Sequence, residues 1–69
     1  MSVEKSIDLF ATGATVEEAV SEAIHRASLT IRGLTSFEVV RIEGSVDDGE
    51  VSYRVLVRVW FVIKEVLHE

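Results

Sequence analysis

The chain has no cysteine, no proline and only two histidines among its 69 residues. The lack of cysteine excludes disulfides and thiolate zinc sites, and His25 and His68 are too few for a histidine-rich metal site. A chain this short lies near the lower limit at which one core holds a fold, and such chains depend on disulfides, metals, partners or very good packing. We therefore expect association with other chains to supply the reinforcement.

The chain also lacks any long apolar run and any basic cluster. No stretch approaches the roughly 20 apolar residues of a membrane-spanning helix, and the N-terminal MSVEKSIDLF alternates and carries acids. We expect a soluble, cytoplasmic protein with no membrane partner. The 12 acidic residues outnumber the 7 basic ones, for a net charge of −5, so we expect no nucleic acid partner. The four glycines stand apart, so residues 1–69 are predicted to form a single domain.

The segment from Glu50 to Lys64, EVSYRVLVRVWFVIK, is the most informative part of the chain. Its odd-numbered positions are all apolar, which is the period of a β-strand with one face in a core. These positions are Val51, Tyr53, Val55, Val57, Val59, Phe61 and Ile63. Its fifteen residues at ~3.3 Å each span about 45–50 Å, far beyond the usual strand. The other face carries Leu56, Trp60 and Val62, so we predict an assembly of identical chains.

A helix is predicted from Val16 to Arg32. Thr15 and Glu18 have the spacing of a capping box at its start, and Gly33 suits a left-handed C-terminal cap beside Arg32 in the last turn. The apolar positions follow the helical i, i+3, i+4 rule along one narrow stripe. This stripe contains Val16, Ala19, Val20, Ala23, Ile24, Ala27, Ile31 and Leu34.

Two more strands complete the predicted fold. Residues 3–11 alternate, with Val3, Ile7 and Leu9 on one face and Phe10 on the other. Residues 37–46 form the second strand, in which Val40, Ile42 and Val46 share a face with Glu38, whereas Phe37 and Val39 share the other with Arg41 and Glu43. Asp48-Gly49 predicts a tight hairpin turn into the long strand, and residues 66–69 are expected to be a frayed tail.

The expected class is therefore α+β, with the order β-α-β-β. The last two strands form a hairpin, the first strand pairs beside it in an antiparallel three-stranded sheet, and the helix packs on one face. The helix stripe is expected to meet six side chains of the long strand, from Val51 to Phe61. The opposite face of the sheet is expected to stay uncovered.

No catalytic constellation is recognisable, so we expect no enzyme and no catalytic residue. His25 falls on the polar face of the helix and is interpreted as a solvated surface residue. The segment 47–50, Asp-Asp-Gly-Glu, lacks the twelve-residue ligand pattern of a calcium loop and is interpreted as a turn. Residues 12–15 present amides that can hold a phosphate at a helix N-terminus, but without a neighbouring lysine we interpret them first as a cap.

A basic line runs along the second face of the long strand, where Arg54, Arg58 and Lys64 alternate with apolar residues. One interpretation is a subunit interface in which the arginines pair with acids, such as Glu4, Asp8, Glu38 or Glu43. The other is a pocket for a flat anionic ligand, in which Trp60 stacks and an arginine neutralises phosphate. Both hold if a small aromatic ligand sits between subunits.

Three segments resemble the dodecin family: AVSEAIHRASLTIRGL in the helix, SFEVVRIEGSV after it, and VSYRVLVRVWFVIK at the end. The resemblance extends over about residues 3 to 64. It implies a sheet partly wrapped around one helix, with twelve copies closing into a hollow sphere of cubic symmetry. Typical members bind pairs of flavins at the two-fold axes, for storage or quenching and without catalysis.

Three positions depart from the pattern of the flavin-binding members. Ser36 stands where they typically carry a tryptophan that stacks on the isoalloxazine ring, and Arg54 stands where a glutamine hydrogen-bonds the ring. Trp60 replaces a common glycine, and it either rebuilds a stacking surface or fills the emptied pocket. The resemblance thus implies a candidate ligand site at these three residues, for FMN, riboflavin or another flat aromatic molecule.

A second functional expectation comes from relatives that lack the flavin tryptophan and are described as calcium-binding. The Tyr53-Arg54 pair resembles that subgroup, although its metal ligands do not transfer to this sequence residue by residue. The alternatives are therefore a self-assembling storage protein for a small molecule, and a structural or calcium-binding shell without flavin.

Overall fold

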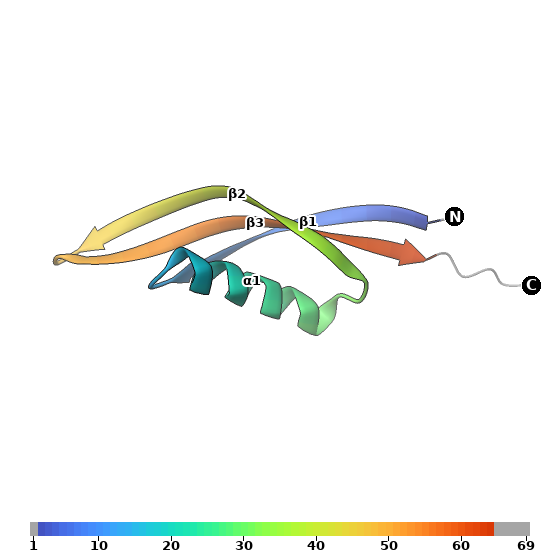
Figure 1. Cartoon of the computed structure of the whole chain (residues 1–69), viewed down its shortest axis with the longest axis horizontal. Helices are drawn as coiled ribbons and strands as arrows, with labels where there is room; N and C mark the ends of the chain where they lie inside the picture. The colour runs from blue at the N-terminus through green and yellow to red at the C-terminus, as the bar shows by residue number, and fades with distance from the viewer. Residues whose placement is uncertain (1, 65–69) are drawn as a thin grey trace, which may run out of the picture.

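The computed structural model describes residues 2–64, which form a three-stranded antiparallel sheet with one helix across one face (Figure 1). The elements in chain order are β1 (Ser2–Gly13), α1 (Val16–Thr30), β2 (Leu34–Asp47) and β3 (Glu50–Lys64). The strands lie in the order β1-β3-β2. The predicted α+β class, the β-α-β-β order and the bounds of the long strand are confirmed. The tail expected over residues 66–69 lies outside the described residues.

The long strand β3 is central because it pairs along its length with both neighbours. Its antiparallel register with β1 runs from Ser2 opposite Lys64 to Gly13 opposite Tyr53. Its register with β2 runs from Leu34 opposite Phe61 to Asp47 opposite Glu50. The turn between β2 and β3 has positive φ at Asp48 (54°) and Gly49 (83°), which confirms the Asp-Gly hairpin.

The face assignment predicted for β2 is wrong in part, because a β-bulge lies between Val39 and Arg41. The bulge inserts one extra residue and shifts the alternation of side chains by one position. Val39 lies opposite Val57 and Ile42 opposite Val55, so both fall on the side of the helix. Arg41 pairs with Leu56 on the other face.

The core of the chain is a contact between three alanines of α1 and three valines of β3. Ala19, Ala23 and Ala27 and Val55, Val57 and Val59 are each at most 2% exposed. Because alanine has almost no side chain, the helix axis can lie close to the sheet. Val51, in contrast, is 52% exposed, so the expected contact from Val51 to Phe61 is confirmed only over its middle.

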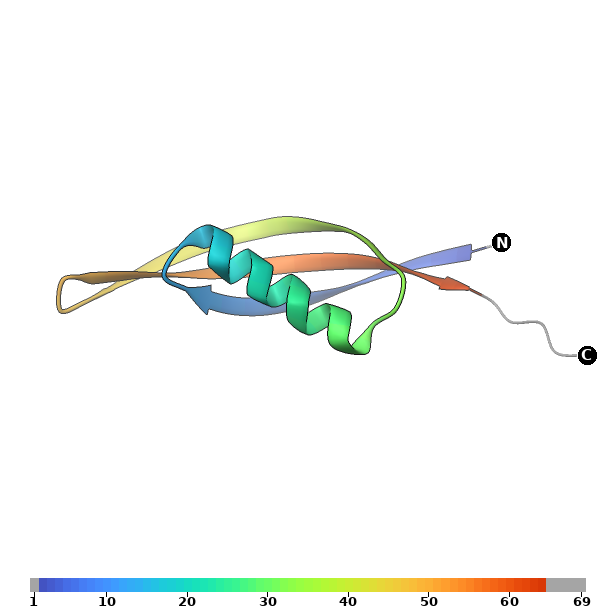
Figure 2. The same cartoon turned by 60° about the horizontal axis from the view of Figure 1, so that its bottom comes forward.

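The contact between α1 and β3 is short because a helix rises less per residue than a strand. The 15 residues of α1 span about 22 Å at 1.5 Å per residue, less than half the length of β3. Figure 2 shows α1 crossing the middle of the sheet, with the β2–β3 hairpin beyond it at one end and the chain termini at the other. Within residues 2–64, no helix is long and apolar enough to cross a membrane.

The start of the helix is as predicted, and its end is not. The amide of Glu18 donates to Thr15 Oγ1 at 3.0 Å, which is the first hydrogen bond of the capping box. The helix ends at Thr30 rather than Arg32, and Ile31 is extended because it turns its side chain onto the core. Gly33 has the expected positive φ, but it lies in the loop, where its carbonyl accepts from the amide of Val62 at 3.2 Å.

Apolar side chains remain exposed on both faces of the sheet. Phe10 is exposed on the face away from the helix, as the sequence predicted for an uncovered face. Most of the exposed large apolar residues within residues 2–64, however, lie on the helix side, either past the ends of the helix or on the strands beside the row that it covers. These are Val3, Ile7, Phe37, Val39, Ile42, Val46, Val51 and Ile63.

We expect Ala23→Leu to destabilise the fold by about 1–3 kcal/mol, because the larger side chain overpacks the contact between α1 and β3. Leucine is nearly as good a helix former as alanine, so the loss would not come from helix propensity. Denaturant unfolding at fixed protein concentration measures the change. Ser21→Leu, on the exposed side of the same helix, is the matched control; equal effects of the two changes would contradict the role of this contact.

Candidate functional site

The register of the strands places the candidate residues in rows on the face of the sheet away from α1, which we call the outer face. Each even-numbered residue of β3 from Arg54 to Trp60 has one partner on β1 and one on β2. The rows are Ser6–Trp60–Ser36, Asp8–Arg58–Glu38, Phe10–Leu56–Arg41 and Thr12–Arg54–Glu43.

Trp60 lies between two serines in its row. Its Cα partners are Ser6 on β1 and Ser36 on β2, and the indole is half-buried. Directly opposite residues in a sheet have their Cβ atoms about 4.5–5.5 Å apart, and a serine side chain is too short to cover an indole at that spacing. The backbone beside it is held by Thr35, whose Oγ1 donates to the Trp60 carbonyl at 3.4 Å. The structure thus brings Ser36 and Trp60 together around a flat aromatic surface.

Arg58 occupies the centre of the outer face and is fully engaged by acids. Its Nε and Nη2 donate to the two carboxylate oxygens of Asp8 at 2.9 and 3.2 Å, and its Nη1 lies 3.9 Å from Glu38. The hydrogen bond from Arg58, together with its charge, lowers the pKa of Asp8 below its ordinary value. Arg58 therefore pairs within one chain with Asp8 and Glu38, two of the acids that the sequence analysis named as partners, and the subunit interface stays a prediction.

Arg54, in the row Thr12–Arg54–Glu43, has a different environment from Arg58. Its guanidinium carbon lies 4.1 Å from the centroid of the Phe10 ring, and its Nη1 is 3.8 Å from Glu43, which also lies 3.5 Å from Arg41. The contact with Phe10 is a cation–π interaction. Sequence reasoning missed Phe10, because only the register of β1 against β3 places it beside Arg54. Lys64 ends β3, and its side chain is outside the described part of the chain.

Arg54 and Trp60 do not form one site within a single chain. They are six positions apart on the same strand and face, which is about 20 Å at the rise of a β-strand. The hollow of about 170 Å³ next to Ser36 is lined by Ile24 and Val59, so it lies on the helix side of the sheet and does not include Trp60 or Arg54. Because of the distance between Arg54 and Trp60, a ligand that contacts all three candidate residues needs surfaces from two chains.

The phosphate interpretation of residues 12–15 gains no support. The amides of Glu18 and Ala19 are already bonded to Thr15, through its Oγ1 and its carbonyl. A Cβ on Gly13 would approach the Ala19 nitrogen to 2.9 Å, so this backbone is closely packed against the helix start. The segment is a cap.

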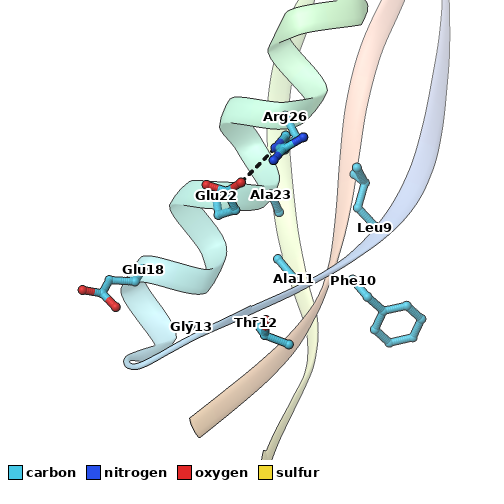
Figure 3. A pocket seen from close by; sticks show the side chains of 9 residues that line it. All are labelled: Leu9, Phe10, Ala11, Thr12, Gly13, Glu18, Glu22, Ala23 and Arg26. Atoms are coloured by element: carbon cyan, nitrogen blue, oxygen red, sulfur yellow. Dashed lines mark hydrogen bonds and ion pairs between the residues drawn. The ribbon is translucent and has the colours of Figure 1, made fainter.

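A groove of about 640 Å³ lies between the free edge of β1 and the helix (Figure 3). Glu22 and Arg26 form an ion pair across one turn of α1 along it, with Nε and Oε2 at 2.9 Å. Phe10 points away from the helix in this view. His25 is exposed on the helix, as predicted. Within residues 2–64, no three His, Asp or Glu side chains converge as they would around a metal ion.

Fold and candidate site together describe a small β-α-β-β protein whose outer face carries a half-buried tryptophan and arginines that pair with acids. The family profile of Dodecin matches residues 3–64. No curated protein sequence matches the chain. The chain belongs to the dodecin family.

Three solved structures illustrate the likeness. A mutant of the dodecin from Thermus thermophilus is 34% identical, with a TM-score of 0.89 over 96% of this chain and 100% of that one. The dodecin from Streptomyces coelicolor is 31% identical, with a TM-score of 0.87 over 94% and 96%. A calcium-chelating antigen named calcium dodecin, from Mycobacterium tuberculosis, is 29% identical, with a TM-score of 0.78 over 97% and 99%.

Family and fold support a small non-enzymatic binding protein. The family is homo-oligomeric and usually dodecameric. Some members bind flavin, and the similar structures also include the calcium dodecin. Overall likeness to these structures therefore does not decide between flavin and calcium as the ligand. That choice depends on the individual residues of this chain.

The pair of Asp8 and Arg58 generates a prediction for pH. Because the folded pKa of Asp8 is lowered, its contribution to stability is present above the unfolded pKa, near 3.8, and is lost as pH falls through the folded value. A carbon-detected NMR titration should show Asp8 titrating below its ordinary value in the natural chain, and near that value in Arg58→Gln. An unchanged titration in the variant would contradict the assigned cause.

Proposed function

We propose that this chain is a non-enzymatic, self-assembling dodecin of the cytoplasm that holds a flat aromatic small molecule, such as FMN or riboflavin, at contacts between subunits. Ser36, Trp60 and Arg54 are the proposed ligand contacts. The observation that carries the proposal is the position of Trp60, half-buried on an open sheet face with a serine on each side. An indole in this position offers a stacking surface to a planar ring.

The tryptophan of this chain stands on β3, whereas the family's stacking tryptophan stands on β2. In the family pattern the stacking residue stands at the position of Ser36, and here Ser36 lies directly opposite Trp60. Cross-strand partners on one face occupy adjacent space. Trp60 can therefore present its ring close to the place that the family's tryptophan occupies, and the small Ser36 leaves room for a ligand beside it.

Arg54 supplies the polar contact in the proposal. Its guanidinium has five donors, and its single ion-pair contact with Glu43 is loose and exposed, at 3.8 Å. Stacking on Phe10 orients the group without using its in-plane donors. Because Arg54 is about 20 Å from Trp60 in the same chain, the arginine that reaches a ligand on Trp60 comes from a second copy.

Assembly is the second part of the proposal, and we propose a dodecamer. The apolar side chains that α1 leaves exposed on both faces of the sheet support it. A chain of 69 residues whose fully buried core is three alanines and three valines gains much from burying more apolar surface.

The second candidate function is a calcium-binding or purely structural shell in which Trp60 fills the former flavin pocket. The observation that favours it is the likeness to calcium dodecin. No cluster of metal-binding side chains forms within residues 2–64 of one chain, and in this candidate the ligands of the ion come from more than one subunit.

Flavin titration tests the first candidate directly, because Trp60 is the only tryptophan of the chain. We expect FMN or riboflavin to lose fluorescence on binding and to quench the tryptophan emission in parallel. Trp60→Leu should weaken binding by roughly two- to tenfold, since a stacking contact contributes about 0.5–1.5 kcal/mol beyond the lost area. Arg54→Gln, which restores the family's residue, should retain binding.

The same experiment separates the two roles of Trp60. If the assembled natural chain leaves flavin fluorescence unchanged and Trp60→Ala gains binding, the indole fills the pocket and the second candidate stands. Val62→Leu, one row away on the outer face, is the control for a general effect of substitution there.

For the calcium candidate, isothermal titration of the metal-free assembly with calcium chloride is the measurement. That candidate predicts saturable heat at a fixed ratio of ions to chains, abolished by excess chelator. Heat that does not saturate, or that magnesium reproduces in full, would argue against a built calcium site.

A further inference from the structure

The two ends of the sheet are two-stranded extensions that nothing in the chain covers. At one end, β1 stops at Gly13 opposite Tyr53, while β2 and β3 continue as a hairpin over residues 44–53, which we call the hairpin arm. At the other end, β1 and β3 continue past the last β2 partner, with Val3 opposite Ile63; we call this the terminal end. Figure 2 shows the two extensions at opposite ends of the long sheet.

Each extension has an apolar pair on the helix side of the sheet. On the hairpin arm, Val46 and Val51 are cross-strand partners and are 73% and 52% exposed. On the terminal end, Val3 and Ile63 are partners and are 59% and 42% exposed. An isolated two-stranded hairpin is at best marginally stable in water, so both extensions gain from being covered.

The charged residues near the two apolar pairs differ in sign. The hairpin arm carries Asp47, Asp48 and Glu50 and no lysine or arginine. Two cations lie next to the terminal end: Lys5 is on the helix side opposite Phe61, in the last row that β2 reaches, and Arg32 is in the loop beside Gly33, whose carbonyl accepts from the amide of Val62. Within residues 2–64 neither of these two cations has an ion-pair partner, whereas Arg26, Arg41, Arg54 and Arg58 all do. Glu4 is also at this end, but on the outer face beside Val62.

From this complementarity we infer that the hairpin arm of one copy docks on the terminal end of the next, with the Val46–Val51 pair against the Val3–Ile63 pair. The acidic turn then comes within reach of Lys5 and Arg32. The occupant of each surface is a second copy of this chain, and the inference rests on the proposed assembly of identical chains.

The hairpin arm and the terminal end are different surfaces, and this difference determines the symmetry of the contact between them. A two-fold axis brings a surface against itself, whereas two different surfaces make a head-to-tail contact, which closes into a ring when the rotation between neighbours allows it. A shell of twelve copies with cubic symmetry has two-fold and three-fold rotation axes. The docking of arm on terminal end therefore belongs to the three-fold axes, and the outer face with Trp60 is left for other contacts.

Cross-linking tests this arrangement cleanly because the chain has no cysteine of its own. Three variants are compared: Val51→Cys, Ile63→Cys, and the two changes together in one chain. With a short bismaleimide, the double variant should give covalent species that stop at three chains, and a mixture of the two single variants, co-assembled from denaturant, should give linked pairs. Each single variant alone should give none.

Two results would overturn the inference and leave the proposed assembly intact. Linked chains from Val51→Cys alone would mean that the arms of different copies meet one another rather than the terminal end. No linkage in an assembled double variant would mean that the two ends do not meet. A natural chain that light scattering finds as a single copy overturns both the inference and the proposed function.

A charge placed in the contact gives an independent measurement. Val51→Asp should abolish assembly beyond the pairs that other contacts hold, while circular dichroism stays unchanged because the residue is already exposed in the single chain. Leu29→Asp, 66% exposed on the helix and outside both extensions, should assemble as the natural chain does. Full-size assembly of Val51→Asp would contradict the docking of the arm.

Discussion

The contact of Ala19, Ala23 and Ala27 with Val55, Val57 and Val59 is the constraint on which the rest of the structure depends. Small side chains on the helix let its backbone approach the sheet closely, and they also limit how much surface one chain can bury. A helix rises about 1.5 Å per residue and a strand about 3.3 Å. With 15 residues in each, α1 can cover only the middle of β3. The uncovered extensions at both ends are a direct consequence of that difference.

The outer face has ion pairs at its centre and the candidate ligand contacts on either side of them. Arg58 is held between Asp8 and Glu38, so the middle of the face is a closed set of ion pairs. Trp60 on one side has only serines beside it, and Arg54 on the other stacks on Phe10. An aromatic surface and a cation about 20 Å apart cannot serve one ligand in a single chain. Binding and assembly are therefore linked in the proposed function, because the site is complete only between copies.

Much of the fold could be predicted from the sequence, because it is encoded in local periodicity. The alternation from Val51 to Ile63, the capping pair Thr15 and Glu18, and the turn at Asp48-Gly49 each depend on residues close together in the chain. Where a prediction failed, a tertiary effect had intervened. Ile31 leaves the helix to pack on the core, and the bulge after Val39 reverses the side-chain alternation of β2. Neither effect has a local sequence signal.

The sequence alone determined which residues alternate, where the helix starts, that disulfides are excluded, and that one chain has more apolar surface than it can bury. Only the tertiary structure decided the register, and with it the neighbours of each candidate residue. Register joins residues far apart in sequence: it places Ser36 opposite Trp60, Phe10 beside Arg54, and Val3 opposite Ile63. A slip of one residue would turn each of these side chains to the other face of the sheet. The candidate residues could be selected from the chain alone, but their arrangement exists only once the three strands are paired.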